Sequence, residues 1–435
     1  MKINIKLATI LLVSSLVTSS IGTVLAQNTT FTTINKTTDK SIRPFKVHIS
    51  ESKIVDLKQR ILNTKWPDRE LVQDQTQGVK LSTMKSLADY WATQYDWHKI
   101  EAKLNSYPQY LTKIQGLDIH FIHVRSKNKN ALPIIITHGW PGSIIEQLKI
   151  IEPLTNPEKY GGSAEDAFDV IIPSLPGHGF SETPKTLGWN PVKIAKAWIE
   201  LMDRLNYDKY VAQGGDWGNA ITENMALLAP EELLGIHTNM AAAVPLEITA
   251  ALAKGTIPDG LTEDQLNAYN QLDFFFKKGV GYASEMSNRP QTLYAVDDSP
   301  VGLAAWMLDH DDRSHKLIER VFSDQKEGLS KMDVLDNISL YWFTNTGVSS
   351  ARLYWEASQA SSAGFFDPRG VKIPVAVSVF PDEIYAVPED WAKKAYSNLI
   401  YFNKLKRGGH FAAWEQPTLF TKEMRSAFKS LRGEH

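Results

Sequence analysis

The sequence predicts an α/β fold with a mostly parallel, doubly wound sheet. Short β-branched runs at residues 133–137, 168–173 and 210–213 alternate with stretches whose apolar residues recur at helical spacing. Strands and helices that alternate at this interval favour parallel pairing, with helices on both faces of the sheet. The alternation stops after residues 234–238 and returns at 371–380. We therefore expect a long helical insertion within one α/β core.

The composition is that of an ordinary soluble globular protein. The 435 residues are 43% hydrophobic and 22% charged, and the net charge of -2 gives no electrostatic reason to expect a nucleic acid partner. The absence of cysteine excludes a disulfide framework, a thiol nucleophile and a thiolate metal site. The 12 tryptophans and 15 tyrosines fit either an apolar cavity or a large aromatic core.

The first residues have the features of an export signal. Lys2 and Lys6 precede an apolar run that ends in small or modest side chains before Gln27. We expect residues 1–26 to be a signal peptide and 27–41 a polar linker. The mature chain would then be exported, as a periplasmic or secreted protein without stable membrane insertion. An uncleaved membrane anchor is the alternative, because the apolar run is long enough to span a bilayer.

Residues 42–126 are expected to form a helical N-terminal domain. An apolar stripe predicts a helix at residues 53–62 with Ser50 as its N-cap, and a second helix is expected at 82–95. Only residues 117–124 of this domain alternate as an entering strand would.

The rest of the chain divides into two core segments and the insertion. Residues 127–240 and 367–435 carry the alternating strands and helices, whereas residues 241–366 are mostly helical, aromatic and loop-rich. Asn190 before Pro191 is typical of a helix start. The core helices are expected at residues 143–154, 191–205, 220–228, 388–396 and from 417 onward, and a last strand at 399–405.

The strongest local signal is Gly214-Gly215-Asp216-Trp217-Gly218, between a predicted strand and a predicted helix. The pattern is typical of a sharp turn that presents a nucleophile, with aspartate in the nucleophile's place and glycine two positions either side. A phosphate-binding turn is disfavoured, because an acidic residue at its centre would repel phosphate and no G-x-G-x-x-G is present. An aspartate that only caps the next helix stays an alternative.

An aspartate nucleophile determines the reaction class. An ionised carboxylate needs no base to attack a saturated carbon, so it can displace an epoxide oxygen or a halide and form an ester. The ester carbonyl then belongs to Asp216, and its hydrolysis requires an activated water and donors to the oxyanion. The expected donors are the backbone N–H groups of Trp217 in the turn and Trp140 after the first core strand. The Trp140 side chain also fits a hydrophobic plug over the sheet.

His410 is the expected water activator. It lies between the last strand and the last helix, where the third member of a hydrolase triad falls. The acid that orients it should follow a core strand. No carboxylate follows residues 234–238, whereas Asp382 and Glu383 follow residues 375–380. Spacing alone does not choose between these two.

The other histidines are expected to be structural. His120 and His123 would point to opposite faces of a strand, which disfavours a metal pair. His138 lies in a strand-end turn and is expected to form structural hydrogen bonds. His310 lies in an Asp-His-Asp-Asp run. Because consecutive positions do not converge on one ion, we expect a solvated helix end there and no metal site in the chain.

These motifs together resemble the epoxide hydrolases of the α/β-hydrolase superfamily, and most of all the branch that holds the microsomal and juvenile-hormone epoxide hydrolases. The resemblance rests on the motifs at residues 138–143, 213–218 and 407–413, and it runs from about Ile42 to the C-terminus. It implies an α/β-hydrolase fold in which the insertion forms a helical lid and the N-terminal domain wraps the core and the lid.

The resemblance also implies further site residues. The branch has its acid in a Phe-Pro-x-Glu segment, which matches Glu383. Two lid tyrosines of the family donate hydrogen bonds to the epoxide oxygen, and Tyr282 and Tyr354 match their positions. Without the resemblance, each would be one of 15 tyrosines and more often a packing residue. The implied reaction converts a small apolar epoxide and water into a vicinal diol, without a cofactor or metal.

Two alternatives stay open. A haloalkane or haloacid dehalogenase would use the same Asp216, His410 and acid, with Trp140 and Trp217 around the halide, but paired lid tyrosines favour an epoxide. A binding protein on a retired hydrolase fold is disfavoured by the intact triad. The sequence leaves open the physiological substrate, the substrate-binding residues, a role in detoxification, catabolism or signalling, and the oligomeric state, a homo-oligomer included.

Overall fold

The computed structural model describes residues 39–325, 328–360 and 364–433. The expected signal peptide and most of the expected linker therefore lie outside the described residues. A nine-stranded sheet forms the centre of the described chain, in the order β1-β2-β3-β5-β4-β6-β7-β8-β9. The strands are β1 (Ile42–Phe45), β2 (Gln109–Ile114), β3 (Leu117–Val124), β4 (Leu132–Thr137), β5 (Phe168–Pro173), β6 (Tyr210–Gly214), β7 (Leu233–Thr238), β8 (Val375–Val379) and β9 (Leu399–Lys404).

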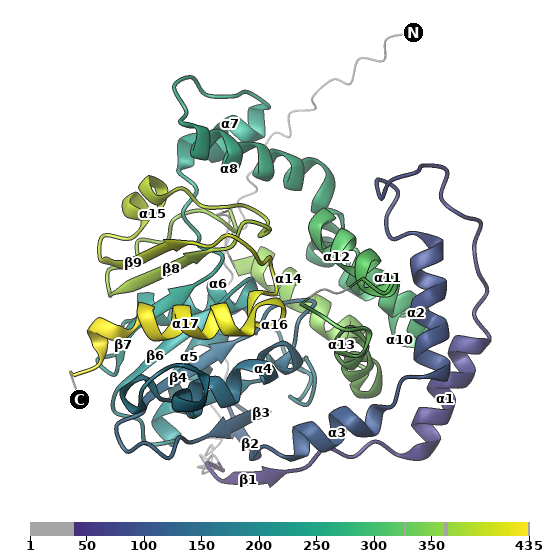
Figure 1. Ribbon diagram of the computed structural model, residues 1–435, viewed down its shortest axis with the longest axis horizontal. Coiled ribbons are helices and arrows are strands. Elements are labelled where there is room, and N and C mark those ends of the chain that lie inside the picture. Colours follow the sequence, from purple (N-terminus) through teal and green to yellow (C-terminus); the bar gives the residue numbers. More distant parts are fainter. Residues whose placement is uncertain (1–38, 326–327, 361–363, 434–435) are drawn as a thin grey trace, which may run out of the picture. The chain divides into compact units, whose positions relative to one another are not determined.

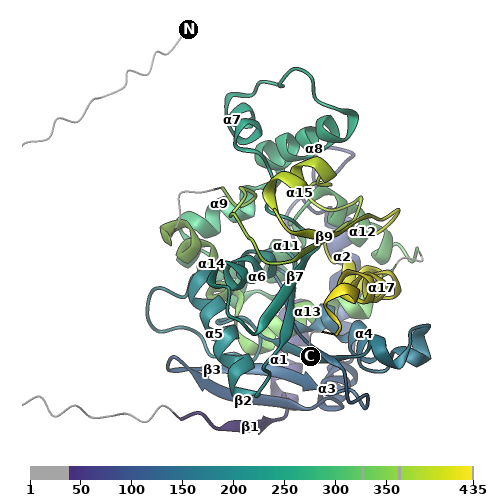
Figure 2. The same ribbon diagram turned by 90° about the vertical axis from the view of Figure 1, so that its left-hand side faces the viewer.

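Six strands, from β5 to β9 in the sheet order, pair in parallel, which confirms the predicted doubly wound core. Every residue of β4, β6 and β8 is buried. This is expected for parallel strands covered on both faces, and it explains why their sequences are continuous apolar runs rather than alternating ones. Figure 2 shows α5 and α6 on one side of the strands and α4 and α17 on the other.

The N-terminal edge of the sheet differs from the prediction. The helical domain expected at residues 42–126 also contributes β1 and β2, which extend the sheet as antiparallel strands next to β3. β3 itself pairs antiparallel with β5. The sequences of β1 and β2 carry no clean alternation, and β1 is only partly buried. Such edge strands depend on pairing with a neighbour more than on their own propensity, so they are hard to predict from the sequence.

The core helices begin close to their predicted positions. At the start of α5 the Asn190 side chain accepts a hydrogen bond from the Lys193 N–H, which confirms the predicted cap. α6 begins at Trp217, three residues before the expected start, so the helix follows the turn at Asp216 directly. The core helices are α4 (Ile144–Thr155), α5 (Pro191–Arg204), α6 (Trp217–Leu228), α15 (Glu389–Ala395), α16 (Ala412–Glu415) and α17 (Pro417–Ala427).

The N-terminal helices pack on helices of the insertion (Figure 1). The indole of Trp91 donates to Ser339 Oγ at 2.9 Å, and the Tyr95 hydroxyl donates to Asp336 Oδ1 at 2.8 Å. The N-terminal helices are α1 (Glu51–Leu62), α2 (Leu81–Thr93) and α3 (Trp97–Asn105), of which α3 was not expected. The insertion holds α7 (Leu246–Lys254), α8 (Glu263–Phe274), α9 (Gly281–Asn288), α10 (Tyr294–Asp298), α11 (Pro300–Leu308), α12 (Asp312–Phe322), α13 (Lys331–Thr344) and α14 (Gly347–Ala360).

The sheet topology decides where functional residues can meet. The carboxyl ends of parallel strands lie at the same edge of a sheet, so the segments after β4, β6, β8 and β9 come together there. The insertion leaves the core after β7 and returns before β8, so it lies over that edge. Within the described part of the chain, no helix is both long enough and apolar enough to span a membrane.

Candidate active site

Asp216 lies in the turn between β6 and α6, with backbone angles of φ 51° and ψ -128° that side-chain-bearing residues rarely adopt. A Cβ on Gly214 would lie 2.1 Å from the Gly218 backbone, and a Cβ on Gly218 would lie 2.0 Å from the Thr137 carbonyl oxygen. The turn is therefore possible only because both positions lack a side chain. This steric requirement explains why glycines two positions either side of Asp216 predicted a sharp turn. It presents the Asp216 carboxylate at the carboxyl edge of the sheet.

One oxygen of this carboxylate is held by the turn after β4. The Trp140 N–H donates to Asp216 Oδ1 at 2.8 Å. A Cβ on Gly139 would lie 2.2 Å from the same oxygen, so this close approach requires glycine. Trp217 is the first residue of α6, and an amide in the first turn of a helix has no intrahelical acceptor. The two expected oxyanion donors therefore both belong to turns that border the carboxylate.

His410 follows β9 and lies between two carboxylates. Its Nε2 is 4.0 Å from Asp216 Oδ2, and its Nδ1 is 2.6 Å from Glu383 Oε1. Glu383 is buried and also accepts a hydrogen bond from the Ile384 N–H. Asp382, the other carboxylate that spacing allowed, has a side chain that is 61% exposed and pairs with Arg313. The geometry therefore pairs His410 with Glu383 and leaves Asp382 in solvent.

The electrostatics of the site favour a charged imidazole in the free protein. Burial opposes the charge on His410, but Glu383, Asp216 and Asp311 outweigh burial and raise the pKa of the imidazole to about 10. In the free protein the imidazole of His410 is therefore charged at neutral pH.

Tyr282 on α9 and Tyr354 on α14 lie opposite the carboxylate. The Tyr282 ring stacks on Trp140 at 5.2 Å between centroids, and the Tyr354 ring meets Trp217 edge to face at 4.7 Å. Burial and the charge on Asp216 hold the pKa of both phenols well above 10, so both stay protonated hydrogen-bond donors. Within the described residues, the buried hydroxyl of Tyr354 has no hydrogen-bond partner. Both phenols can therefore donate to a ligand.

Two cavities meet at Asp216. The larger one, of about 700 Å³, lies on the lid side and is lined mainly by aromatic and small side chains, with Asp216, Trp217, Tyr282 and Tyr354 at its base. The smaller one, of about 20 Å³, is lined by Asp216 and His410 and has room for about one water molecule. Its polar lining residues are Glu146, Gln147, Gln213 and Asn239.

Glu146 was not predicted as a site residue. It lies in the first turn of α4, is buried, and borders the small cavity. Burial raises its pKa to about 8, against smaller opposing effects of His410 and Gln147. A glutamate in a helix's first turn is common at any surface, so the sequence carried no signal that this one faces inward.

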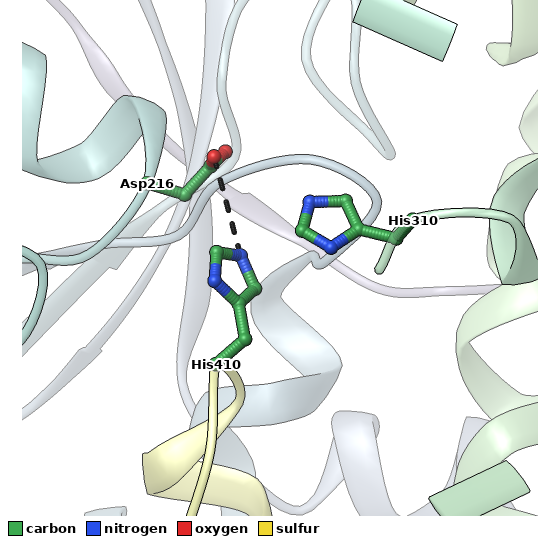
Figure 3. A group of neighbouring side chains, drawn as sticks. All are labelled: Asp216, His310 and His410. Atoms are coloured by element: carbon green, nitrogen blue, oxygen red, sulfur yellow. Dashed lines mark ion pairs between the residues drawn. The ribbon is translucent and has the colours of Figure 1, made fainter. Parts of the chain in front are cut away.

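His310 corrects another prediction. Instead of a solvated helix end, it is 1% exposed and lies inside the site. Its Nδ1 is 3.0 Å from Asp311 Oδ2, and its ring centroid is 4.4 Å from that of His410 (Figure 3). Asp311 caps α12 through the N–H groups of Arg313 and Ser314. The acidic run therefore does begin a helix, as expected, but its histidine points into the core.

Two further histidines, His120 and His138, have structural surroundings. Leu175 N–H donates to His138 Nε2 at 3.2 Å, and His138 Nδ1 lies 2.9 Å from the Gly139 carbonyl oxygen. His120 contacts Ser174 and Gln109. The prediction of structural hydrogen bonds for His138 is confirmed.

Comparisons with known proteins agree with this geometry. The model of the epoxide hydrolase N terminus matches residues 42–147, and that of the alpha/beta hydrolase fold matches residues 133–287. The sequence is 48% identical to a Stigmatella aurantiaca protein named as a candidate epoxide hydrolase, in an alignment that covers 90% of this chain and 86% of that protein. It is 38% identical to epoxide hydrolase 1 of Oryctolagus cuniculus, over 89% of this chain and 88% of that protein.

The chain belongs to the epoxide hydrolase family. The chain matches the crystal structure of juvenile hormone epoxide hydrolase from the silkworm Bombyx mori with a TM-score of 0.80 and 31% sequence identity. The match covers 92% of this chain and 96% of that one. The α/β-hydrolase fold and the activity class that the resemblance implied are thereby confirmed. The chain is an enzyme rather than a retired binding protein.

Proposed function

We propose that this epoxide hydrolase works through a covalent ester on Asp216. Oδ2 of Asp216 attacks an epoxide carbon, the carbon–oxygen bond of the ring breaks, and an alkyl ester forms. The observation that carries the proposal is that the two oxygens of the Asp216 carboxylate have different surroundings. Oδ1 is held by the Trp140 N–H at 2.8 Å, while Oδ2 faces His410 across 4.0 Å. The first oxygen is thus fixed as the future ester carbonyl and the second is left as the nucleophile.

Tyr282 and Tyr354 serve as the acids of this step. The epoxide oxygen leaves as an alkoxide, which is too basic to depart without a proton donor. Both phenols stay protonated because their pKa values are held well above 10, and their rings lie 6.0 Å apart, which lets both reach one oxygen. A departing halide needs no such donor. The paired phenols therefore support an epoxide rather than a haloalkane as substrate.

Water then cleaves the ester. Ester formation removes the negative charge of Asp216, which is one of the charges that raise the pKa of His410, so a proton can pass from the imidazolium to the tyrosine that lost one. The neutral imidazole then accepts a proton from a water molecule, the resulting hydroxide adds to the Asp216 carbonyl carbon, and the Trp140 and Trp217 N–H groups stabilise the oxyanion. Glu383 keeps the imidazole in the required tautomer through Nδ1 at 2.6 Å. The small polar cavity beside Asp216 and His410 is the place for this water. Collapse expels the second diol oxygen, which takes the proton from His410. The proton of the Asp216 carboxyl group then passes back to His410, so that the starting carboxylate and imidazolium are restored.

The substrate is a small apolar epoxide. The lid-side cavity of about 700 Å³ is lined by Phe275, Phe276, Val280, Phe365 and Phe366 in addition to the tyrosines. Among the described residues that line it, only Asp216 and Arg369 are charged. Such a lining favours hydrocarbon substituents on the epoxide over charged ones.

We also propose that the enzyme is exported, because Lys2 and Lys6 precede an apolar run with a cleavage-like end. Fractionation of producing cells, with N-terminal sequencing of the enzyme from each fraction, tests this. A mature N-terminus near Gln27 in the periplasm or medium supports export, and an intact Met1 in the membrane fraction supports the anchor instead.

Labelled water tests the covalent mechanism. In a single turnover with enzyme in excess over an aryl epoxide in H₂¹⁸O, the diol should carry unlabelled oxygen and the label should appear in the peptide that contains Asp216. Direct attack of water on the epoxide would instead put the label in the diol during the first turnover, which would overturn the proposal.

A further inference from the structure

Three buried side chains of the site converge on one point. Asp216, His310 and His410 each offer an oxygen or nitrogen atom, and these atoms all lie within 4.8 Å of one another. Figure 3 shows that they come from three separate segments and point toward a common space. No other group of three or more carboxylate or imidazole side chains converges in this way among the described residues.

Both imidazoles are prepared to act as ligands through the same nitrogen. Nδ1 of His410 faces Glu383 at 2.6 Å, and Nδ1 of His310 faces Asp311 at 3.0 Å. When Nδ1–H donates to a carboxylate, Nε2 is the nitrogen at which a metal ion can replace a proton. Nε2 of His310 is buried and has no hydrogen-bond partner in the described chain. A carboxylate behind each imidazole is the arrangement that orients metal-binding histidines and raises their basicity.

We propose that Asp216, His310 and His410 bind one divalent transition-metal ion, with Zn²⁺ as the best-fitting ion, and that the bound ion inhibits the enzyme. The donor set of two imidazoles and one carboxylate is one that Zn²⁺ commonly takes, with a fourth position left for water. Mg²⁺ and Ca²⁺ are disfavoured, because they require oxygen ligands in larger number.

The charge of the site favours a cation. Three carboxylates surround the two imidazoles: those of Asp216 and Glu383, which are buried, and that of Asp311, whose side chain is 10% exposed. A divalent ion at the centre would compensate these charges without moving the carboxylates behind the imidazoles.

The distances are close to those of a bound ion. Tetrahedral Zn²⁺ with bonds of roughly 2.1 Å places neighbouring ligand atoms about 3.4 Å apart. His410 Nε2 and Asp216 Oδ2 are 4.0 Å apart, so a contraction of less than an ångström joins them on one ion. The large cavity reaches Asp216 and provides both an entry path and space for the fourth ligand.

Inhibition follows from the residues that the ion would occupy. Asp216 lies at the base of the substrate cavity, and an ion on its carboxylate would compete with the epoxide for the same oxygen. Binding of the ion does not require the ester mechanism proposed above, so the affinity for the ion can be measured separately from catalysis.

The test uses the full chain without an affinity tag. Co²⁺ binding is followed by its visible absorption, and Zn²⁺ affinity by competition with a chromophoric chelator. We expect one ion per chain, and at least a tenfold loss of affinity in His310→Phe, which keeps a ring of similar size. Asp311→Asn keeps a cap for α12 and should weaken binding about 10- to 100-fold. His315→Phe is the matched control, because His315 also pairs with an aspartate, Asp309, but lies outside the group of three.

Epoxide hydrolysis in buffers of fixed free Zn²⁺ provides the second readout. Inhibition should follow the binding curve, be reversed by a chelator, and weaken in parallel in His310→Phe. Absence of one-to-one binding, or equal affinity in the parent and both the His310→Phe and Asp311→Asn variants, would overturn the site. Loss of affinity in His315→Phe equal to that in His310→Phe would also overturn it.

Discussion

The core and the lid contribute to the active site in different ways. The core supplies Asp216, Glu383 and His410 from turns at the ends of parallel strands, and the sheet topology alone brings these turns together. The lid supplies Tyr282 and His310 from helices and loops whose positions depend on packing against Trp140. The positions of the core's site residues are therefore determined by local sequence and strand order, whereas the positions of the lid's site residues are determined by tertiary contacts.

The largest effect is expected from removing the core nucleophile. Asp216→Ala should lower diol formation by roughly 10⁶-fold, because the carboxylate that forms the ester is gone. The variant should keep the parent's thermal unfolding transition, since alanine also fits the turn's sterics better than a larger residue. Steady-state assays with an aryl epoxide measure the loss. Turnover within tenfold of the parent enzyme would assign the nucleophile elsewhere.

The next largest effect on activity is expected from replacing Glu383, the acid that pairs with His410. Glu383→Gln should reduce kcat by about 10³- to 10⁴-fold, because glutamine no longer stabilises the imidazolium and can hold the wrong tautomer of His410. Asp382→Asn is the matched control, since the Asp382 side chain is 61% exposed, and this variant should change kcat less than about threefold. Equal losses in the two variants would contradict the pairing of His410 with Glu383.

The contribution of the lid to epoxide opening is tested by replacing its two tyrosines. The double substitution Tyr282→Phe and Tyr354→Phe should slow epoxide opening by about 10²- to 10³-fold, because the alkoxide loses both donors. Pre-steady-state measurement of ester formation separates this step from hydrolysis. The hydrolysis rate of a preformed ester should change little, and a loss confined to hydrolysis would remove the tyrosines from the first step.

The smallest predicted effect concerns stability where the N-terminal helices meet the lid. Burial raises the pKa of Asp336 to about 7, with a smaller increase from Asp333 and against smaller opposing effects of Tyr95 and Lys149. The folded state thus holds the proton more tightly than the unfolded state, whose pKa is about 3.9. The stabilising protonation is complete below that value and is lost as pH rises through 7.

Asp336→Asn removes this titration while still accepting the Tyr95 hydrogen bond. The variant should exceed the parent in unfolding free energy by about 2 kcal/mol more at pH 8 than at pH 4.5. Urea unfolding at the two pH values measures the difference. An advantage that does not change with pH would show that Asp336 is not neutral in the folded enzyme near pH 5.

The contrast between core and lid also explains what the sequence could predict. The parallel strands are continuous apolar runs, and the turn at Asp216 requires glycines at fixed positions, so both leave a local signal. Glu383 could be separated from Asp382 only by the family resemblance, because adjacent residues share the same spacing. The edge strands β1 and β2 and the inward orientation of His310 leave no local signal. His310 in particular lies directly before Asp311, which caps a helix, and such an acidic helix start ordinarily lies in solvent.

Trapping the ester tests the central claim most directly. His410→Gln removes the water-activating base but leaves Asp216 and both lid tyrosines in place, so the ester should form and persist. Intact-mass spectrometry after exposure to an aryl epoxide should then show one adduct per chain, with the mass of the whole epoxide, and peptide mapping should locate it on Asp216. An unmodified chain, or an adduct on any other residue, would contradict the account.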